Sequence, residues 1–238
     1  MRYRRVMPTG AVSRLPFVLA FARREPSAIL LAAQLAGVLL YPFMEGSEVG
    51  RALFSIFGIA ILGLVVLAVR STRGLTRISV LLGAPATVLL LIQAATRSKD
   101  LQPYSSGFEA VLYLYAAGAL IAYMLADHII TRDEMWAVGA TFTLVAWAFA
   151  YLYVVLQAVE PGSFSAEIKP EADRTWMELL YLSFTTLTSV GLSDIVPVKP
   201  FARGVVMIEQ LAGIGYVAIL VSRLIGLTIH RGMQEEKS

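Results

Sequence analysis

Residues 174–197 read RTWMELLYLSFTTLTSVGLSDIVP, and this stretch decides what kind of fold the chain adopts. Its apolar first part, Trp176 to Leu187, is much shorter than the roughly 20 residues that a helix needs to cross the hydrocarbon core of a bilayer. Hydroxyl side chains, a glycine and an aspartate follow before the chain turns at Pro197. The pattern predicts a re-entrant half-helix that enters a membrane and returns through non-helical backbone.

The order of these parts is suited to holding a cation. A half-helix that ends inside the membrane directs the partial negative charge of its C-terminus at whatever lies there. Extended backbone beyond it can turn carbonyl oxygens toward an axis and replace the hydration shell of an ion. Non-helical backbone survives at membrane depth only where it is buried in protein or lines a water-filled path. We therefore predict that Thr188 to Asp194 line an ion path.

The composition around this stretch is typical of a membrane protein. Of the 238 residues, 57% are hydrophobic and 16% are charged, which argues against a soluble enzyme. No cysteine is present, so disulfides, thiolate metal sites and cysteine nucleophiles are excluded. The net charge of +3 comes from short segments between apolar runs, where orientation in a bilayer explains it better than nucleic-acid binding. Without a His-Glu metal motif, a nucleophile elbow or a phosphate-binding glycine loop, we expect no enzymatic activity.

Six stretches outside the half-helix approach the length of a membrane span. They are Ser27 to Phe43, Ala52 to Val69, Leu75 to Ala95, Phe108 to Ile130, Met135 to Val159 and Ala202 to Ile229. The predicted fold class is an all-α membrane protein with six transmembrane helices and a re-entrant pore half-helix between the last two.

The basic residues orient this arrangement. With both termini cytoplasmic, thirteen of the 20 Lys and Arg residues lie on the cytoplasmic side and seven lie outside, as the positive-inside rule requires. We therefore expect a multi-pass protein of the cell membrane. The predicted domains are a basic cytoplasmic segment (1–26), a four-helix peripheral domain (27–130), a pore domain (131–229) and a short cytoplasmic tail (230–238).

The re-entrant stretch resembles the pore loop and selectivity filter of the potassium channel superfamily. The usual pattern is Thr-x-Thr-Val-Gly-Tyr-Gly-Asp followed by a proline, and residues 186–197 here read TLTSVGLSDIVP. Gly213 lies nineteen residues after Asp194, where channels of this family commonly place the glycine hinge of the inner helix. The specific resemblance covers about Met135 to Gly226, and the six-helix arrangement extends it to most of the chain.

The resemblance implies roles for individual residues. The carbonyl oxygens of residues 189–192 and the Ser189 hydroxyl would face potassium, within a filter formed by Thr188, Ser189, Val190, Gly191, Leu192 and Ser193. Asp194 would lie at the outer mouth and accept a hydrogen bond from Tyr181 behind the filter. One chain supplies one loop, so a homotetramer is implied. Its other partners would be the lipid bilayer and monovalent cations, with no cofactor and no nucleic acid.

Two residues depart from the family pattern. Leu192 stands where Tyr is usual and keeps the backbone carbonyl. Ser193 replaces the second glycine at a position that commonly adopts positive φ, which costs a non-glycine residue roughly 1–2 kcal/mol. We expect the inner ion sites to persist and the selectivity for K+ over Na+ to weaken. A potassium channel and a non-selective monovalent cation channel are therefore both kept as predictions.

Three further features concern gating. Phe108 to Ile130 contains no Arg or Lys, so a conventional voltage sensor is not expected, and Asp127 and His128 fit an ordinary interfacial placement. We expect Glu209 to be the one ionisable residue well inside a span, with filter support or gating and a plain structural hydrogen bond both open. Gly213 allows either bending of the last helix or close helix packing.

An acidic cluster precedes the half-helix on the outer side, and simple solvation explains it better than cation gathering, because Lys169 and Arg174 partly cancel its charge. The cluster consists of Glu160, Glu167, Glu171 and Asp173.

Two functions of other classes are also kept as alternative predictions. A secondary transporter would need paired broken helices in two related halves, whereas one interruption is visible here. A non-conducting membrane scaffold would be compatible with the altered filter.

Overall fold

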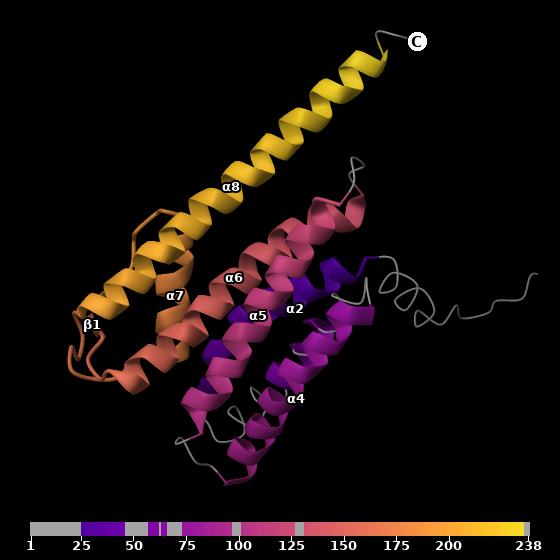
Figure 1. Cartoon of the computed structure of the whole chain (residues 1–238). Helices are drawn as coiled ribbons and strands as arrows, with labels where there is room; N and C mark the ends of the chain where they lie inside the picture. Colours follow the sequence, from indigo (N-terminus) through magenta and orange to yellow (C-terminus); the bar gives the residue numbers. More distant parts are fainter. Residues whose placement is uncertain are drawn as a thin grey trace, which may run out of the picture.

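The computed structural model describes residues 25–45, 57–61, 63–65, 73–96, 101–126 and 131–235. Its elements are, in chain order, α2 (Pro26–Glu45), α4 (Arg73–Thr96), α5 (Gln102–Met124), α6 (Arg132–Val159), β1 (Phe164–Ala166), α7 (Trp176–Leu187), β2 (Ile195–Pro197) and α8 (Pro200–Glu235). Residues 57–61 and 63–65 are also helical. Figure 1 shows the long helices packed side by side, with α7 beside one end of α8 and the β1 loop at that same end.

Four of the described helices are long and apolar enough to cross a membrane: Pro26–Phe43, Gln102–Met124, Arg132–Val159 and Pro200–Arg223. They correspond to four of the six predicted spans. The apolar part of α4, Arg77–Gln93, is shorter, and most of the predicted span 52–69 lies outside the described residues. Four of the six predicted spans are therefore helices of suitable length and composition, and the other two stay predictions. Residues 1–24, Asp127, His128 and 236–238 also lie outside the described part of the chain.

The half-helix α7 has the predicted bounds, and its sequence explains both ends. Thr175 and Glu178 form a capping box, in which the Glu178 N–H donates to Thr175 Oγ1 at 3.3 Å and the Thr175 N–H donates to Glu178 Oε2 at 2.6 Å. At the other end Thr188 lies past the last helical residue, and its N–H still donates to the Phe184 carbonyl. The same Thr-x-x-Glu device starts α6 at Thr131 and Glu134.

The prediction of an all-α chain misses a small antiparallel ribbon. Strand β1 pairs with β2, with Phe164 opposite Pro197 and Ala166 opposite Ile195. Three residues are too few to produce a recognisable alternation of apolar and polar side chains, so the sequence carries no clear strand signal here. The ribbon matters for the site because β2 begins directly after Asp194.

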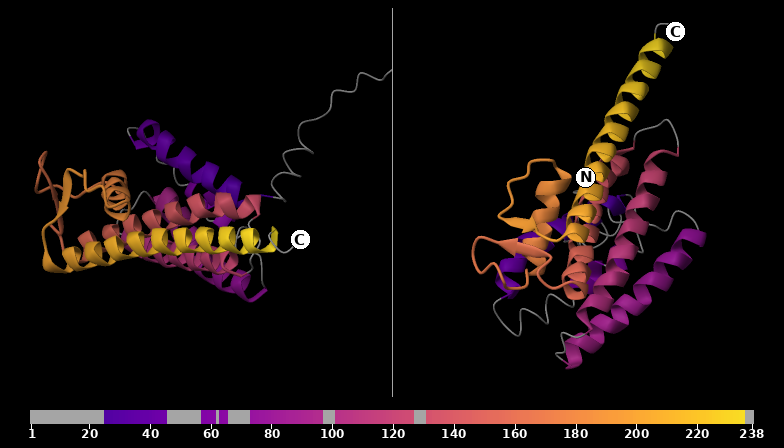
Figure 2. Two further views of the ribbon diagram at one scale, coloured as in Figure 1. Left: turned by 90° about the horizontal axis from the view of Figure 1, so that it is seen from above. Right: turned by 60° about the vertical axis from the view of Figure 1, so that its left-hand side comes forward.

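Helix α6 lies at the centre of the molecule and contacts α2, α5, α7 and α8. Aromatic side chains fix the start of α7 against it: the ring of Trp176 lies 5.2 Å from Trp147 and 5.5 Å from Tyr151. Tyr113 of α5 extends the cluster, with its ring 5.7 Å from Tyr151. The views in Figure 2 show α7 as a short helix beside the much longer α6 and α8. The central packing therefore positions the half-helix.

The expectation of a single buried ionisable residue is wrong. Helix α5 begins at Gln102, six residues before the predicted span, so Glu109 lies inside the helix rather than at its edge. Its carboxyl group is buried and faces the side chain of Tyr151 of α6. Glu109 therefore joins α5 to α6, and it lies outside the filter segment.

Candidate ion-conduction site

The loop before α7 is fastened to the end of α6. Gln157 and Arg174 form a reciprocal pair, with the Gln157 amide donating to the Arg174 carbonyl at 2.8 Å and the Arg174 N–H donating to Gln157 Oε1 at 3.1 Å. The buried guanidinium of Arg174 donates to the carbonyls of Lys169 and Ala172 and lies 3.5 Å from Glu178. Arg174 is thus turned into the loop, instead of acting as the surface counter-charge that the sequence suggested.

The N–H groups at the end of α7 and just beyond it all donate to carbonyls of α7. Thr188 donates to Phe184, Ser189 donates to Thr186, and Val190 and Gly191 both donate to the Thr185 carbonyl, each at 3.0 Å. Residues 188–191 are therefore fixed to the half-helix through their amide groups.

This amide pattern determines where the carbonyls point. In a planar trans peptide the C=O of one residue is antiparallel to the N–H of the next. Because the N–H groups of Ser189, Val190 and Gly191 point at α7, the carbonyls of Thr188, Ser189 and Val190 point away from it. Among the described residues, none of these three carbonyls accepts a hydrogen bond. Three successive carbonyl oxygens are therefore free on one side of the chain, and such oxygens are suitable ligands for an alkali cation.

Backbone conformation differs from the expectation at Ser193. The positive φ angles in the filter segment lie at Ser189 (59°) and Gly191 (69°), and Ser193 is not among the described residues with positive φ. The strain predicted for Ser193 is therefore absent, and the left-handed non-glycine residue of this segment is Ser189. The Ser193 side chain has a local role instead, because its Oγ accepts a hydrogen bond from the Ile195 N–H at 3.0 Å.

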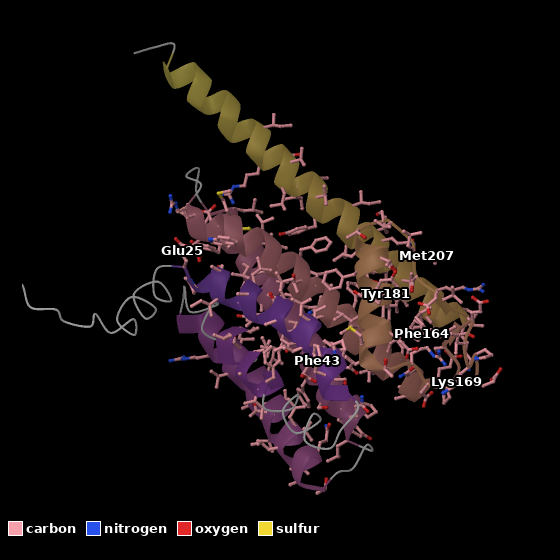
Figure 3. All side chains as sticks on the ribbon, turned by 180° about the vertical axis from the view of Figure 1, so that it is seen from behind. Glu25, Phe43, Phe164, Lys169, Tyr181 and Met207 are labelled. Carbon is pink, nitrogen blue, oxygen red and sulfur yellow. The ribbon has the colours of Figure 1, made fainter. Side chains whose placement is uncertain are left out.

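Tyr181 also has a different partner from the expected one. Its hydroxyl donates to the carbonyl oxygen of Leu192 at 2.8 Å, and no hydrogen bond to the Asp194 side chain is found in the described part of the chain. Tyr181, labelled in Figure 3, lies on α7. The Leu192 carbonyl therefore points toward α7, whereas the resemblance to the potassium channel filter predicts that it faces the ion. Asp194 is exposed, as a residue of an outer mouth would be.

The ribbon fixes the chain beyond the filter. The Val198 N–H donates to the Ser163 carbonyl at 2.9 Å and continues the pairing of β1 with β2. Phe164 packs its ring 5.0 Å from Tyr153 of α6. Lys199 lies 3.6 Å from Glu160, which gives this member of the acidic cluster a nearby cation. The segment is thus anchored to α7 on one side and to the end of α6 on the other.

Glu209 of α8 lies behind the half-helix and links three helices. It is fully buried, accepts a hydrogen bond from the Tyr153 hydroxyl of α6, and is hydrogen-bonded through its other carboxyl oxygen to the Ser183 hydroxyl of α7. Ser183 also lies 2.8 Å from the Ala146 carbonyl of α6. The sequence singled out Glu209 but not its partners, because no spacing rule connects residues on three separate helices.

Gly213 lies at the closest approach of α8 to the half-helix. A Cβ atom at this position would lie 2.1 Å from the carbonyl oxygen of Leu187, the last residue of α7. Helix α8 runs without interruption from Pro200 to Glu235. The geometry therefore gives Gly213 a packing role directly beneath the filter segment, which was one of its two predicted roles.

No group of three or more His, Cys, Asp and Glu side chains arranged to hold a metal ion occurs within the described ranges. The oxygen atoms free for a cation in the described filter segment are backbone carbonyls and the Ser189 hydroxyl. Oxygen donors of this kind fit a weakly bound, permeant ion rather than a tightly held divalent metal.

Comparisons with known proteins agree with this geometry. A family model described as an ion channel matches residues 110–229, which is 120 of the 238 residues. Two relatives are both called protein LctB. The one from Geobacillus stearothermophilus is 31% identical over 107 residues, which cover 44% of this chain and 79% of the relative. The one from Bacillus caldotenax is 29% identical over 109 residues, which cover 44% and 81%. No solved structure matches the chain.

Proposed function

Because the chain belongs to an ion channel family of the potassium channel superfamily, we propose that it is the pore-forming subunit of a homotetrameric potassium channel without a conventional voltage sensor. The observation that carries this proposal is the row of free carbonyls at Thr188, Ser189 and Val190, all directed away from α7. A cation passing along this row would exchange its water ligands for protein oxygens.

The half-helix adds to the attraction for a cation. Its C-terminal end lies directly before the free carbonyls, and the partial negative charge there favours a positive ion. The Thr188 hydroxyl is engaged with the Phe184 carbonyl at 2.7 Å, whereas the Ser189 hydroxyl has no hydrogen bond within the described residues. Ser189 is therefore the side chain that we assign to ion contact.

A tetramer is proposed because one chain supplies a single row of carbonyls, and an ion on an axis needs a ring of them. The face of α8 that bears Met207, Ile208 and Leu211 is exposed in the single chain, as is the filter residue Val190. Three further copies around an axis would cover much of this apolar surface and close the filter. We place the assembly in the cell membrane with both termini cytoplasmic, on the basis of the Lys and Arg distribution.

A non-selective monovalent cation channel is the second candidate. The Leu192 carbonyl points toward α7, so the outer part of the filter offers fewer oxygens than the family pattern implies. A secondary transporter agrees less well with the structure. Such a protein would need paired broken helices, and only one short re-entrant helix occurs in the part of the chain that the structure describes. A scaffold would have no need of the free carbonyls.

Single-channel recording from the purified protein in planar bilayers tests the proposal. Discrete openings in KCl are expected, with a smaller current when NaCl replaces it. Equal currents in both salts would favour the non-selective channel. Absence of discrete openings in both salts, with protein correctly inserted as a tetramer, would overturn the channel proposal.

A further inference from the structure

The peptide plane between Leu192 and Ser193 is oriented opposite to the three planes between Thr188 and Gly191. The Leu192 carbonyl accepts a hydrogen bond from Tyr181 and so points at α7. Because the peptide is planar and trans, the Ser193 N–H must point away from α7. In the three planes from Thr188 to Gly191 the arrangement is reversed, with N–H groups toward α7 and carbonyls away from it.

We propose that Tyr181 determines the ion selectivity of this filter by holding the Leu192 carbonyl away from the ion path. This inference rests on the proposed channel function. The Leu192 carbonyl is then missing from the carbonyl row, and the group that its peptide directs to the ion side is the Ser193 N–H, a hydrogen-bond donor. A donor offers no ligand to a cation, so the outermost ion site is missing. Fewer consecutive sites mean weaker discrimination between K+ and Na+.

Tyr181 is well placed to act in this way because its own position is fixed. It lies on α7, which is packed against α6 through Trp176 and through the 2.8 Å contact of Ser183 with the Ala146 carbonyl. On the other side of the reversed peptide, Ser193 Oγ accepts from Ile195, the first residue of β2. The Leu192 peptide thus lies between two anchored elements.

The Leu192 side chain does not hold this orientation. It is 73% exposed in the single chain, so packing within the subunit contributes little to it. Backbone strain does not hold it either, because Ser193 has no positive φ. The hydrogen bond from Tyr181 is therefore the contact that keeps the carbonyl turned toward α7.

Replacing the hydroxyl tests the inference directly. Tyr181→Phe keeps the ring and removes the donor, which frees the Leu192 carbonyl to turn toward the ion path. The matched control is Tyr104→Phe, because Tyr104 is exposed on α5 and its hydroxyl has no hydrogen bond within the described residues. Reversal potentials of reconstituted channels under opposing K+ and Na+ give the permeability ratio. We expect Tyr181→Phe to raise the preference for K+ about fivefold, the factor that one ordinary hydrogen bond supports, and the control to match wild type.

The outcomes separate the two proposals. If the wild-type protein passes no cation current, the channel function itself fails. If the wild type conducts and conducting Tyr181→Phe channels keep the same K+ to Na+ ratio, the channel function stands and the role of Tyr181 is overturned.

A second measurement does not depend on a conducting variant. Labelling Leu with 13C at the carbonyl and Ser with 15N selects two Leu–Ser pairs in the whole sequence, Leu182–Ser183 inside α7 and Leu192–Ser193 in the filter. Solid-state NMR of the wild-type tetramer in bilayers then reports the Leu192 carbonyl, with Leu182 as the internal reference. Labelling Val and Gly in the same way selects three Val–Gly pairs, Val49–Gly50, Val138–Gly139 and Val190–Gly191, so the Val190 carbonyl is assigned as the resonance that is lost in Val190→Ile.

We expect exchange of K+ for Na+ to shift the Val190 carbonyl resonance and to leave that of Leu192 in place. In Tyr181→Phe the Leu192 resonance is expected to become ion-dependent. A wild-type Leu192 resonance that shifts as much as that of Val190 would show that this carbonyl contacts the ion, and the inference would be wrong even if the variant failed to assemble.

Discussion

Ser189 and Gly191 are the two filter residues with positive φ, and Ser189 lies between two of the three peptide planes whose carbonyls share one side of the chain. In an ordinary extended strand, successive carbonyls point in opposite directions. When residues with positive φ alternate with residues with negative φ, every second peptide plane is turned over relative to its orientation in an extended strand. Successive carbonyls then point in the same direction. Gly191 adopts this conformation without cost, whereas Ser189 carries a strain of about 1–3 kcal/mol that its anchored neighbours must maintain.

The first prediction concerns Gly191. We expect Gly191→Ala to reduce K+ flux at least about tenfold, because a Cβ at φ 69° disfavours the left-handed conformation and turns the neighbouring carbonyls out of line. Gly118→Ala on α5 is the matched control, since a Cβ there meets no atom within 4 Å. Flux into liposomes with matched amounts of tetramer is the measurement. Wild-type flux through Gly191→Ala would contradict the alignment by left-handed residues.

The second prediction concerns Gly213. Gly213→Ala should lower the free energy of unfolding by about 1–3 kcal/mol, because the added methyl group overlaps the Leu187 carbonyl and helix α8 or α7 must shift. Gly215→Ala is the control two residues away, where nothing lies within 4 Å of the added atom. Denaturant unfolding in detergent compares the two variants. Equal stabilities would show that Gly213 is not needed for close packing.

At the scale of the elements, three helices meet at the carboxyl group of Glu209. The number of hydroxyl protons around this carboxyl group limits its protonation state. The Ser183 hydroxyl has one proton but two acceptors within reach, the Ala146 carbonyl and the Glu209 carboxyl. All contacts are satisfied when Ser183 donates to Ala146 and a protonated Glu209 donates to Ser183. The other Glu209 oxygen then accepts from Tyr153. We infer that a neutral carboxylic acid joins α6, α7 and α8.

The third prediction follows from this proton count. Glu209→Gln should behave like the wild type in stability and conduction, because an amide can donate to Ser183 and accept from Tyr153. Glu209→Leu should lower the free energy of unfolding by about 1–3 kcal/mol, since it leaves buried hydroxyls unpaired. Unfolding in detergent and K+ flux are measured on both variants. A large loss in Glu209→Gln would mean that the charged form is the native one.

These elements also show what the sequence could predict. The bounds of α7 follow from a short apolar run between polar ends, and Thr175 with Glu178 is a local capping signal that indicates its start. Two features were beyond prediction because they depend on contacts between distant segments: the partners of Glu209, and the ribbon of β1 with β2. Glu109 was missed for a different reason, since the predicted span began six residues too late.

At the scale of the whole molecule, a second polar network joins α6, α8 and α2 through the start of α6. Figure 1 shows that α7 lies toward the other end of α6. Arg223 of α8 pairs with Glu134 at the start of α6, with a nitrogen to oxygen distance of 2.8 Å. The neighbouring Asp133 accepts hydrogen bonds from the Ser27 N–H and hydroxyl at the start of α2, both at 3.0 Å. The long helix α8 is thus joined to α6 near the filter through Glu209 and again at its far half through Arg223.

The fourth prediction tests how strongly the far half of α8 depends on this ion pair. Both side chains are largely buried, at 13% and 6% exposure, so removing one partner leaves a charge without its counter-ion in a poorly solvated place. We expect Arg223→Gln to lower the free energy of unfolding by about 3 kcal/mol.

The double variant Arg223→Gln with Glu134→Gln should lose less unfolding free energy than the sum of the two single variants, with a coupling of about 1–3 kcal/mol. Thr131 still caps α6 in both backgrounds, because Gln at position 134 keeps the N–H and an acceptor. Unfolding of all four proteins in one detergent completes the cycle. Additive losses would mean that the two residues stabilise the protein independently of each other.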